Sequence, residues 1–175
     1  MRHPRADHSP RGLHTHRART ERQGDARPGA LHGRSTALVE LEAWYGDDQE
    51  DAVPVRTAAE LDAVLDEVSA MRGRVIVHLK VARPPSLDVR RMILNVGLNG
   101  DAGLGSLFYR SPSGAWYSQG AAANPSVTEL LYYYMNSDTE YPLDCEIPID
   151  AVRRAAHEYL GAVDRRPSAP GWQVF

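Results

Sequence analysis

The residues that could carry catalysis are few, and their spacing matches no recognised active site. Beyond residue 36 the chain has two histidines, His78 and His157, and a single cysteine, Cys145. Neither histidine has a second histidine or a cysteine at the spacing of metal ligands. The carboxylates of Asp144 and Glu146 flank Cys145 and should raise the pKa of its thiol, which disfavours a nucleophile. We therefore interpret both histidines as structural or solvated side chains.

The glycine-rich stretch from residue 95 to residue 106 is the next place to look for chemistry. Its glycines do not follow the G-x-G-x-x-G spacing of dinucleotide-binding loops, and the chain has no P-loop, G-x-S-x-G or H-E-x-x-H motif. Asn99-Gly100-Asp101 lacks the other ligands of a calcium loop. We interpret the stretch as a turn between strands. We expect neither catalytic residues nor a cofactor nor a metal, and the chain is not expected to be an enzyme.

Charge divides the chain into two unlike parts near residue 36. Residues 1–36 hold eight arginines, five histidines and three acids, a formal charge of +5. With almost no apolar residues this segment cannot bury enough surface to fold, so we expect a disordered basic tail. Three interpretations stay open: a flexible tail or an overextended gene start, a basic arm that touches nucleic acid, or metal binding by its histidines, His3, His8, His14, His16 and His32.

The second part, residues 37–175, holds twelve basic residues and twenty acids, a formal charge of −8. It is long enough for one domain with its own core. No stretch approaches the roughly 18 apolar residues of a membrane helix, and no apolar secretory segment is present, so we expect a cytoplasmic protein without a membrane partner. One lysine among twenty basic residues indicates a high-GC genome, such as that of an actinobacterium. A compact acidic domain without catalytic groups predicts a binding protein with a basic partner.

Hydrophobic periodicity predicts the elements of this domain. Helices are expected over residues 58–71, where Thr57 and Glu60 fit a capping box, and over 151–163, where Asp150 is the expected cap. Strands are expected over residues 37–44, 75–81, 89–98, 104–110, 115–118, 127–135 and 144–149, with a short irregular or strand-like tail at 170–173. The run 127–135 keeps helix as an alternative. This order predicts an α+β fold: a mainly antiparallel sheet of about five to seven strands with two helices packed on one face.

Acidic and aromatic residues alternate along the predicted loops and strands of the domain. Tyrosine and tryptophan are frequent anchors of protein interfaces, and an acidic rim speeds capture of a basic partner. The alternative is that the aromatics belong to the core and the acids to a solvated face. The residues that we expect to contact a partner are Asp101, Glu129, Tyr132, Tyr134, Asp138 and Glu140.

Short motifs in the second half of the chain resemble the Imm1 family of bacterial immunity proteins. They are Leu107-Phe108-Tyr109, the run Gly114–Gly120, Ile147-Pro148-Ile149 before the last helix, and the endings Arg166-Pro167 and Trp172-Gln173. The resemblance covers roughly residues 37–173. Its motif residues are Trp116, Arg166, Pro167 and Trp172, for which structural roles compete with contact roles. The family occurs in polymorphic toxin systems, often beside deaminase-type toxins.

The resemblance implies a cytoplasmic protein that binds a cognate toxin domain and neutralises it by blocking its active site or substrate groove. Toxins that act on nucleic acid tend to be basic, so the acidic charge of the domain agrees with such a target. One rival is a small-molecule-binding or catalytic α+β domain that uses the sheet face near His78 and Glu129. Another is a nucleic-acid-binding protein that uses the basic tail, which the acidic body disfavours.

Overall fold

The computed structural model describes residues 39–175. The expectations for the basic tail, residues 1–36, fall outside that range. The elements in chain order are β1 (Leu41–Trp44), β2 (Val53–Val55), α1 (Ala58–Ser69), β3 (Val75–Val81), α2 (Leu87–Arg90), β4 (Ile93–Asn99), the 3-10 helix η1 (Gly100–Ala102), β5 (Leu104–Ser111), β6 (Gly114–Ser118), β7 (Leu131–Tyr134), β8 (Ser137–Glu140), β9 (Ile147–Pro148), α3 (Ile149–Gly161) and β10 (Trp172–Val174). Among the described residues, no helix is long and apolar enough to cross a bilayer.

The ten described strands form one sheet. Its main path runs β10-β6-β5-β4-β3-β1-β2, and the pairs along this path are antiparallel. Off the path, β9 pairs with β5, β8 pairs with β7, and β7 runs parallel to the start of β3. The α+β prediction with a mainly antiparallel sheet is confirmed, although the sheet has more strands than predicted.

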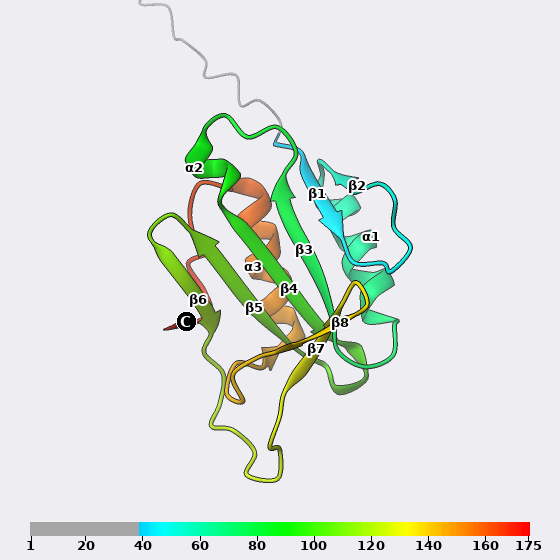
Figure 1. Cartoon of the computed structure of the whole chain (residues 1–175), viewed down its shortest axis with the longest axis vertical. Coiled ribbons are helices and arrows are strands. Elements are labelled where there is room, and N and C mark those ends of the chain that lie inside the picture. The colour runs from blue at the N-terminus through cyan, green and yellow to red at the C-terminus, as the bar shows by residue number, and fades with distance from the viewer. Residues whose placement is uncertain (1–38) are drawn as a thin grey trace, which may run out of the picture. The chain divides into compact units, whose positions relative to one another are not determined.

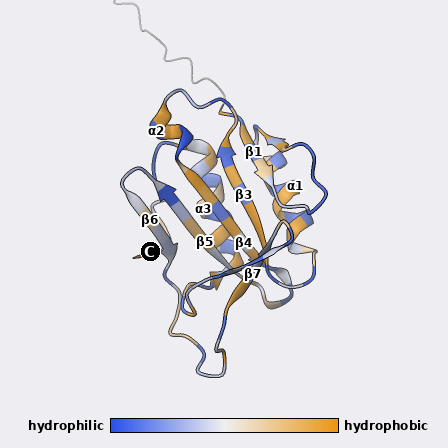
Figure 2. Ribbon diagram, viewed as in Figure 1, coloured by the Kyte–Doolittle hydropathy of each residue, from blue (hydrophilic) through white to orange (hydrophobic). Residues whose placement is uncertain are grey.

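The two long helices, α1 and α3, cover one face of the sheet (Figure 1). Alternate residues of β3 and β4, such as Val77 and Val96, are fully buried beneath them, and both strands are strongly hydrophobic (Figure 2). This packing confirms the prediction of two helices on one face. The buried helical residues are Leu61, Val64, Leu65, Val68, Val152, Ala155, Ala156 and Tyr159.

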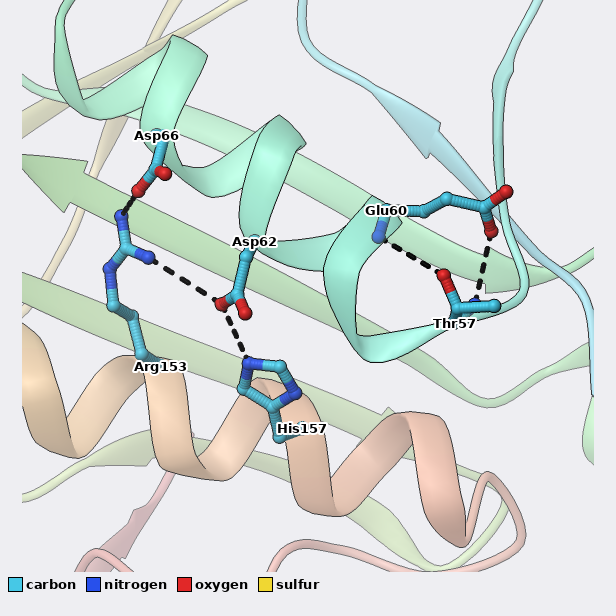
Figure 3. Close-up of polar contacts among 6 residues, drawn as sticks. All are labelled: Thr57, Glu60, Asp62, Asp66, Arg153 and His157. Carbon is cyan, nitrogen blue, oxygen red and sulfur yellow. Dashed lines mark hydrogen bonds and ion pairs between the residues drawn. The ribbon is translucent and has the colours of Figure 1, made fainter.

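Polar contacts tie the two helices together on their outer side (Figure 3). The guanidinium of Arg153 pairs with Asp66 and lies 3.6 Å from the carboxylate of Asp62. The Nε2 atom of His157 lies 2.8 Å from the same Asp62 carboxylate. His157 therefore links α3 to α1, which agrees with its interpretation as a structural side chain.

The start of α1 has the predicted capping box. The Thr57 hydroxyl accepts a hydrogen bond from the amide of Glu60 at 3.2 Å, and the Glu60 carboxylate accepts one from the amide of Thr57 at 3.0 Å (Figure 3). The cap predicted for the last helix is wrong. Helix α3 begins at Ile149 with Pro148 as its N-cap residue and without a side-chain cap, so Asp150 lies inside the first turn.

The predicted strand over residues 89–98 is wrong at its start. The Ser86 hydroxyl accepts a hydrogen bond from the amide of Val89 at 3.2 Å and caps the short helix α2, so β4 begins only at Ile93. The predicted strand over residues 127–135 is shorter, because only Leu131–Tyr134 finds strand partners. Two strands were not predicted: β2, which contains a proline, and β8, whose four residues are all exposed.

Candidate partner-binding surface

The sheet face opposite α1 and α3 carries a continuous row of polar and aromatic side chains. Residues in register on neighbouring strands point to the same face, so the row can be followed from β1 to β10. It consists of Trp44, His78, Asn95, Phe108, Tyr117 and Gln173. We call this face the open face of the sheet. Figure 1 views it from the front, with the two long helices behind the strands.

The β7–β8 hairpin crosses one end of the open face (Figure 1) and is held there by Tyr132. The Tyr132 ring is fully buried in a second, smaller core that contains Ile76, Leu130, Tyr141 and Cys145. A Cβ atom added to Gly97 of β4 would lie only 2.6 Å from this ring, so the glycine makes room for the tyrosine.

A partly buried polar contact fixes the same tyrosine. Its hydroxyl donates to a carboxylate oxygen of Glu146 at 3.0 Å, and the Nε of Arg74 donates to that carboxylate at 2.8 Å. Burial, together with the neighbouring Glu146 charge, raises the pKa of Tyr132 far above its usual range. Tyr132 is therefore a neutral structural anchor. Its side chain has no exposed surface in this conformation, and the expected contact with a partner stays a prediction.

Alternation along the hairpin decides which of the other expected residues face solvent. Leu131 pairs with Glu140 and Tyr133 with Asp138, so these four side chains share the outer face of the hairpin. Tyr134 shares the inner face with Tyr132, and its ring centroid lies 6.0 Å from that of His78. Asp138 and Glu140 are therefore brought together and exposed, as a contact role requires.

The hairpin also forms hydrogen bonds with an acidic loop that precedes β2. The Tyr133 hydroxyl donates to the Asp47 carboxylate at 2.7 Å, and the amide of Asn136 donates to it at 3.1 Å. The loop is hydrophilic (Figure 2) and includes three more acids, Asp48, Glu50 and Asp51. We call the loop acids and the hairpin acids, Asp138 and Glu140, the acidic rim. Our sequence-based contact set did not include Tyr133, the residue that joins the two parts.

The two remaining expected residues lie outside this rim. Asp101 is exposed in η1, between β4 and β5, and Glu129 is exposed just before the buried Leu130. Within residues 39–175, no ion pair connects either carboxylate to the hairpin. Their contact roles remain predictions.

A pocket of about 280 Å³ opens where β6, the residues after β8 and β10 meet. Its walls combine aromatic and apolar side chains with one carboxylate: Tyr117, Glu140, Tyr141, Pro142, Val174 and Phe175. Val174 and Phe175 are about 80% exposed, which is unusual for large apolar side chains. Sequence patterns do not reveal this pocket, because the pairing of β10 with β6 brings together residues that are far apart in the chain.

His78 lies half-buried in the middle of the open face. Its Nδ1 atom is 2.8 Å from the Oδ1 atom of Asn95. Burial lowers the pKa of His78 and the positive charges of Lys80 and Arg110 lower it further, against the opposing effect of the Asn95 hydrogen bond. Among the described residues, no hydrogen bond or ion pair joins His78 to Glu129, and no group of three or more ligand-type side chains could hold a metal ion.

The family-motif residues gather at the opposite face of β6 and β10. The guanidinium of Arg166 lies 4.6 Å from the ring centroid of Trp116 and 5.4 Å from that of Trp172. The indole N–H of Trp172 donates to the Pro167 carbonyl at 3.0 Å. Both tryptophans pack against the main core, so these contacts hold β10 against β6. The four residues have structural roles in this conformation.

Comparison with known proteins identifies the family of the chain. The family described as Immunity protein Imm1 matches residues 49–174, which is more than half of the chain and includes all four motif residues. No curated protein matches the chain. The extent of the family match is sufficient to decide the relationship: the chain belongs to the Imm1 family of immunity proteins.

Proposed function

We propose that the chain binds a cognate toxin domain in the cytoplasm and neutralises it by covering its active site or substrate groove. Membership of the Imm1 family supports an immunity role. The observation that carries the proposed mode of binding is the open face of the sheet, with the acidic rim beside it. Inhibition by this route is stoichiometric and needs no catalytic group.

The distribution of charge supports a basic target. Residues 37–175 have a formal charge of −8, and the stretch from residue 111 to residue 152 contains six acids without a lysine or arginine. Such a surface attracts a positively charged partner and speeds its association. A toxin that acts on nucleic acid, such as a deaminase, needs a basic groove for its substrate. The acidic rim would then compete with the nucleic acid for that groove.

The contact residues that we propose follow from their exposure. Asp138 and Glu140 on the outer face of the hairpin are the centre of the proposed interface, and Tyr133 lies beside them. Asp101, Glu129 and the half-buried Tyr134 are proposed to extend it. Tyr132 contributes indirectly, because it fixes the position of the hairpin.

The test is protection of cells from the toxin domain encoded beside this chain. The variant Asp138→Arg/Glu140→Arg should lose both protection and co-purification, while its thermal unfolding stays close to that of the wild type. A matched control, Asp88→Arg/Asp164→Arg, makes the same change in net charge at exposed acids on α2 and after α3, away from the hairpin.

The control variant should protect as the wild type does. Protection by Asp138→Arg/Glu140→Arg would remove these acids from the interface. Failure of the wild type to protect or to form a complex would contradict the proposed function with this toxin.

A further inference from the structure

The pocket on the open face has a lining that suits one kind of side chain. Three of its six residues are aromatic, and their rings lie close together: the centroid of Tyr117 is 4.9 Å from that of Tyr141 and 5.7 Å from that of Phe175. Phe108 continues the aromatic wall, with its centroid 4.9 Å from that of Tyr117. Tyr117 and Tyr141 are buried, so the accessible ring of the pocket is that of the exposed Phe175, and an aromatic face attracts a cation.

The pocket also has a negative charge at its rim. Within residues 39–175, the Glu140 carboxylate takes part in no ion pair, and its side chain is exposed. A second carboxylate, that of Asp144, lies nearby, because it accepts a hydrogen bond at 3.0 Å from Gln173, the β10 residue in register with Tyr117. Among the described residues, Asp144 takes part in no ion pair either.

The same chain shows how such a combination holds a cation. On β1 and β3, the Lys80 ammonium lies 5.4 Å from the Trp44 ring centroid and 3.0 Å from a carboxylate oxygen of Glu42. At the motif cluster, a guanidinium lies over two tryptophan rings. The pocket repeats the aromatic and carboxylate parts of the first arrangement, but no ion pair or cation–π contact among residues 39–175 supplies a cation to it.

We propose that this pocket receives an arginine side chain of the toxin. The aliphatic stem of the arginine would pack against Pro142, its guanidinium plane would stack on the Phe175 ring, and its N–H groups would donate to the Glu140 carboxylate. An apolar side chain in the same place would strip water from Glu140 without replacing its hydrogen bonds. A lysine lacks the planar group that stacks and donates in two directions at once.

The inference rests on the proposed function for the source of the arginine, but the pocket can be tested without a toxin. The probe is Nα-acetyl-arginine methylamide, titrated into the isotope-labelled full chain and followed by NMR. One stacked, ion-paired guanidinium predicts a dissociation constant of about 10 mM. We expect saturable shifts for the backbone amides of Tyr117, Tyr141 and Val174. The citrulline analogue has nearly the same shape without the charge, and it should bind at least about fivefold more weakly.

Two variants locate the contact. Glu140→Gln removes the charge with little change of shape, and it should weaken binding of the arginine probe about fivefold. Asp164→Asn removes one charge after α3, outside the pocket, and should leave the binding constant unchanged. Equal binding of the arginine and citrulline probes, equal binding by Glu140→Gln, or no saturation up to about 100 mM would each overturn the proposal.

The toxin complex separates this inference from the proposed function. If the wild type binds the toxin, Glu140→Gln should weaken the complex about tenfold, and Asp164→Asn should not. If the wild type binds the arginine probe but no toxin, the proposed function fails and the pocket stands. If the wild type and Glu140→Gln bind the toxin with the same affinity, and the arginine probe causes no shifts, the pocket assignment fails and the proposed function stands.

Discussion

Replacing Gly97 by alanine should weaken the packing of the β7–β8 hairpin against the sheet. The added Cβ atom would lie 2.6 Å from the Tyr132 ring and 2.5 Å from the Ser106 hydroxyl oxygen. Carbon atoms in contact are normally about 3.5–4.0 Å apart, so the ring has to retreat by about 1 Å. The ring belongs to the second core and cannot retreat without moving the hairpin that carries it.

The expected loss of stability has two parts. Overpacking of a buried site costs about 1–3 kcal/mol. Movement of the ring also lengthens the hydrogen bond from the Tyr132 hydroxyl to Glu146, now 3.0 Å, and a hydrogen bond to a charged group contributes about 1.5–3 kcal/mol when intact. With part of this bond retained, we expect a total loss of about 2–4 kcal/mol. For a domain of about 140 residues this lowers Tm by roughly 7–14 °C.

Thermal and urea unfolding of Gly97→Ala, followed by circular dichroism, measure this loss. Gly161→Ala is the matched control, because a Cβ atom added at Gly161 meets no atom within 4 Å. The control should unfold at or slightly above the wild-type temperature. Adding Tyr132→Leu to Gly97→Ala should cost less than Tyr132→Leu costs alone, since the two sites share one contact. A Gly97→Ala protein that is as stable as the control would refute the tight packing of Tyr132 on Gly97.

Three further predictions concern single side chains. Burial lowers the pKa of His78 below its ordinary value of 6.5, so the neutral imidazole stabilises the fold above that pH and this stability is lost as the pH falls. The urea midpoint of the wild type should therefore drop between about pH 7 and pH 5 more steeply than that of His78→Gln. Parallel curves for the two proteins would contradict this. Arg166→Met should lower the free energy of unfolding by about 1–2 kcal/mol, because it removes the two contacts with the indole rings. Urea unfolding measures this loss, and Arg166→Lys should retain part of the stability. Equal stability of Arg166→Met and wild type would show that the stacking contributes nothing. Thr57→Ala should lower the free energy of unfolding by about 1 kcal/mol, because it removes the hydroxyl that caps α1. Thr57→Ser keeps a hydroxyl, so a Thr57→Ser protein as destabilised as Thr57→Ala would argue against the hydroxyl contact.

Local patterns predicted the elements whose cause is local. Strand β3 has the predicted bounds because Val75, Val77 and Leu79 alternate with the residues between them, and the start of α1 follows from the capping box. Strand β8 has no such pattern, since all its residues are exposed and only pairing with β7 makes it a strand. The short helix α2 depends on one serine cap within a run that otherwise reads as a strand.

The candidate surface was predictable in kind but not in detail. Three consecutive tyrosines must alternate between the two faces of a strand, yet the sequence does not say which face is inward. Packing of Tyr132 on Gly97 decides it, and that contact joins β7 to β4. The pocket likewise depends on contacts between distant segments, since Phe175 reaches Tyr117 only through the pairing of β10 with β6.

The reactivity of the single cysteine can report how often the hairpin opens. Cys145 is fully buried in the second core, and burial raises the pKa of its thiol to about 12. A disulfide reagent should therefore react only with molecules in which this core has opened, because the thiolate is the reactive form. Comparing the rate of thiol modification with the rate of global unfolding would show whether the hairpin lifts by itself or only when the whole sheet unfolds.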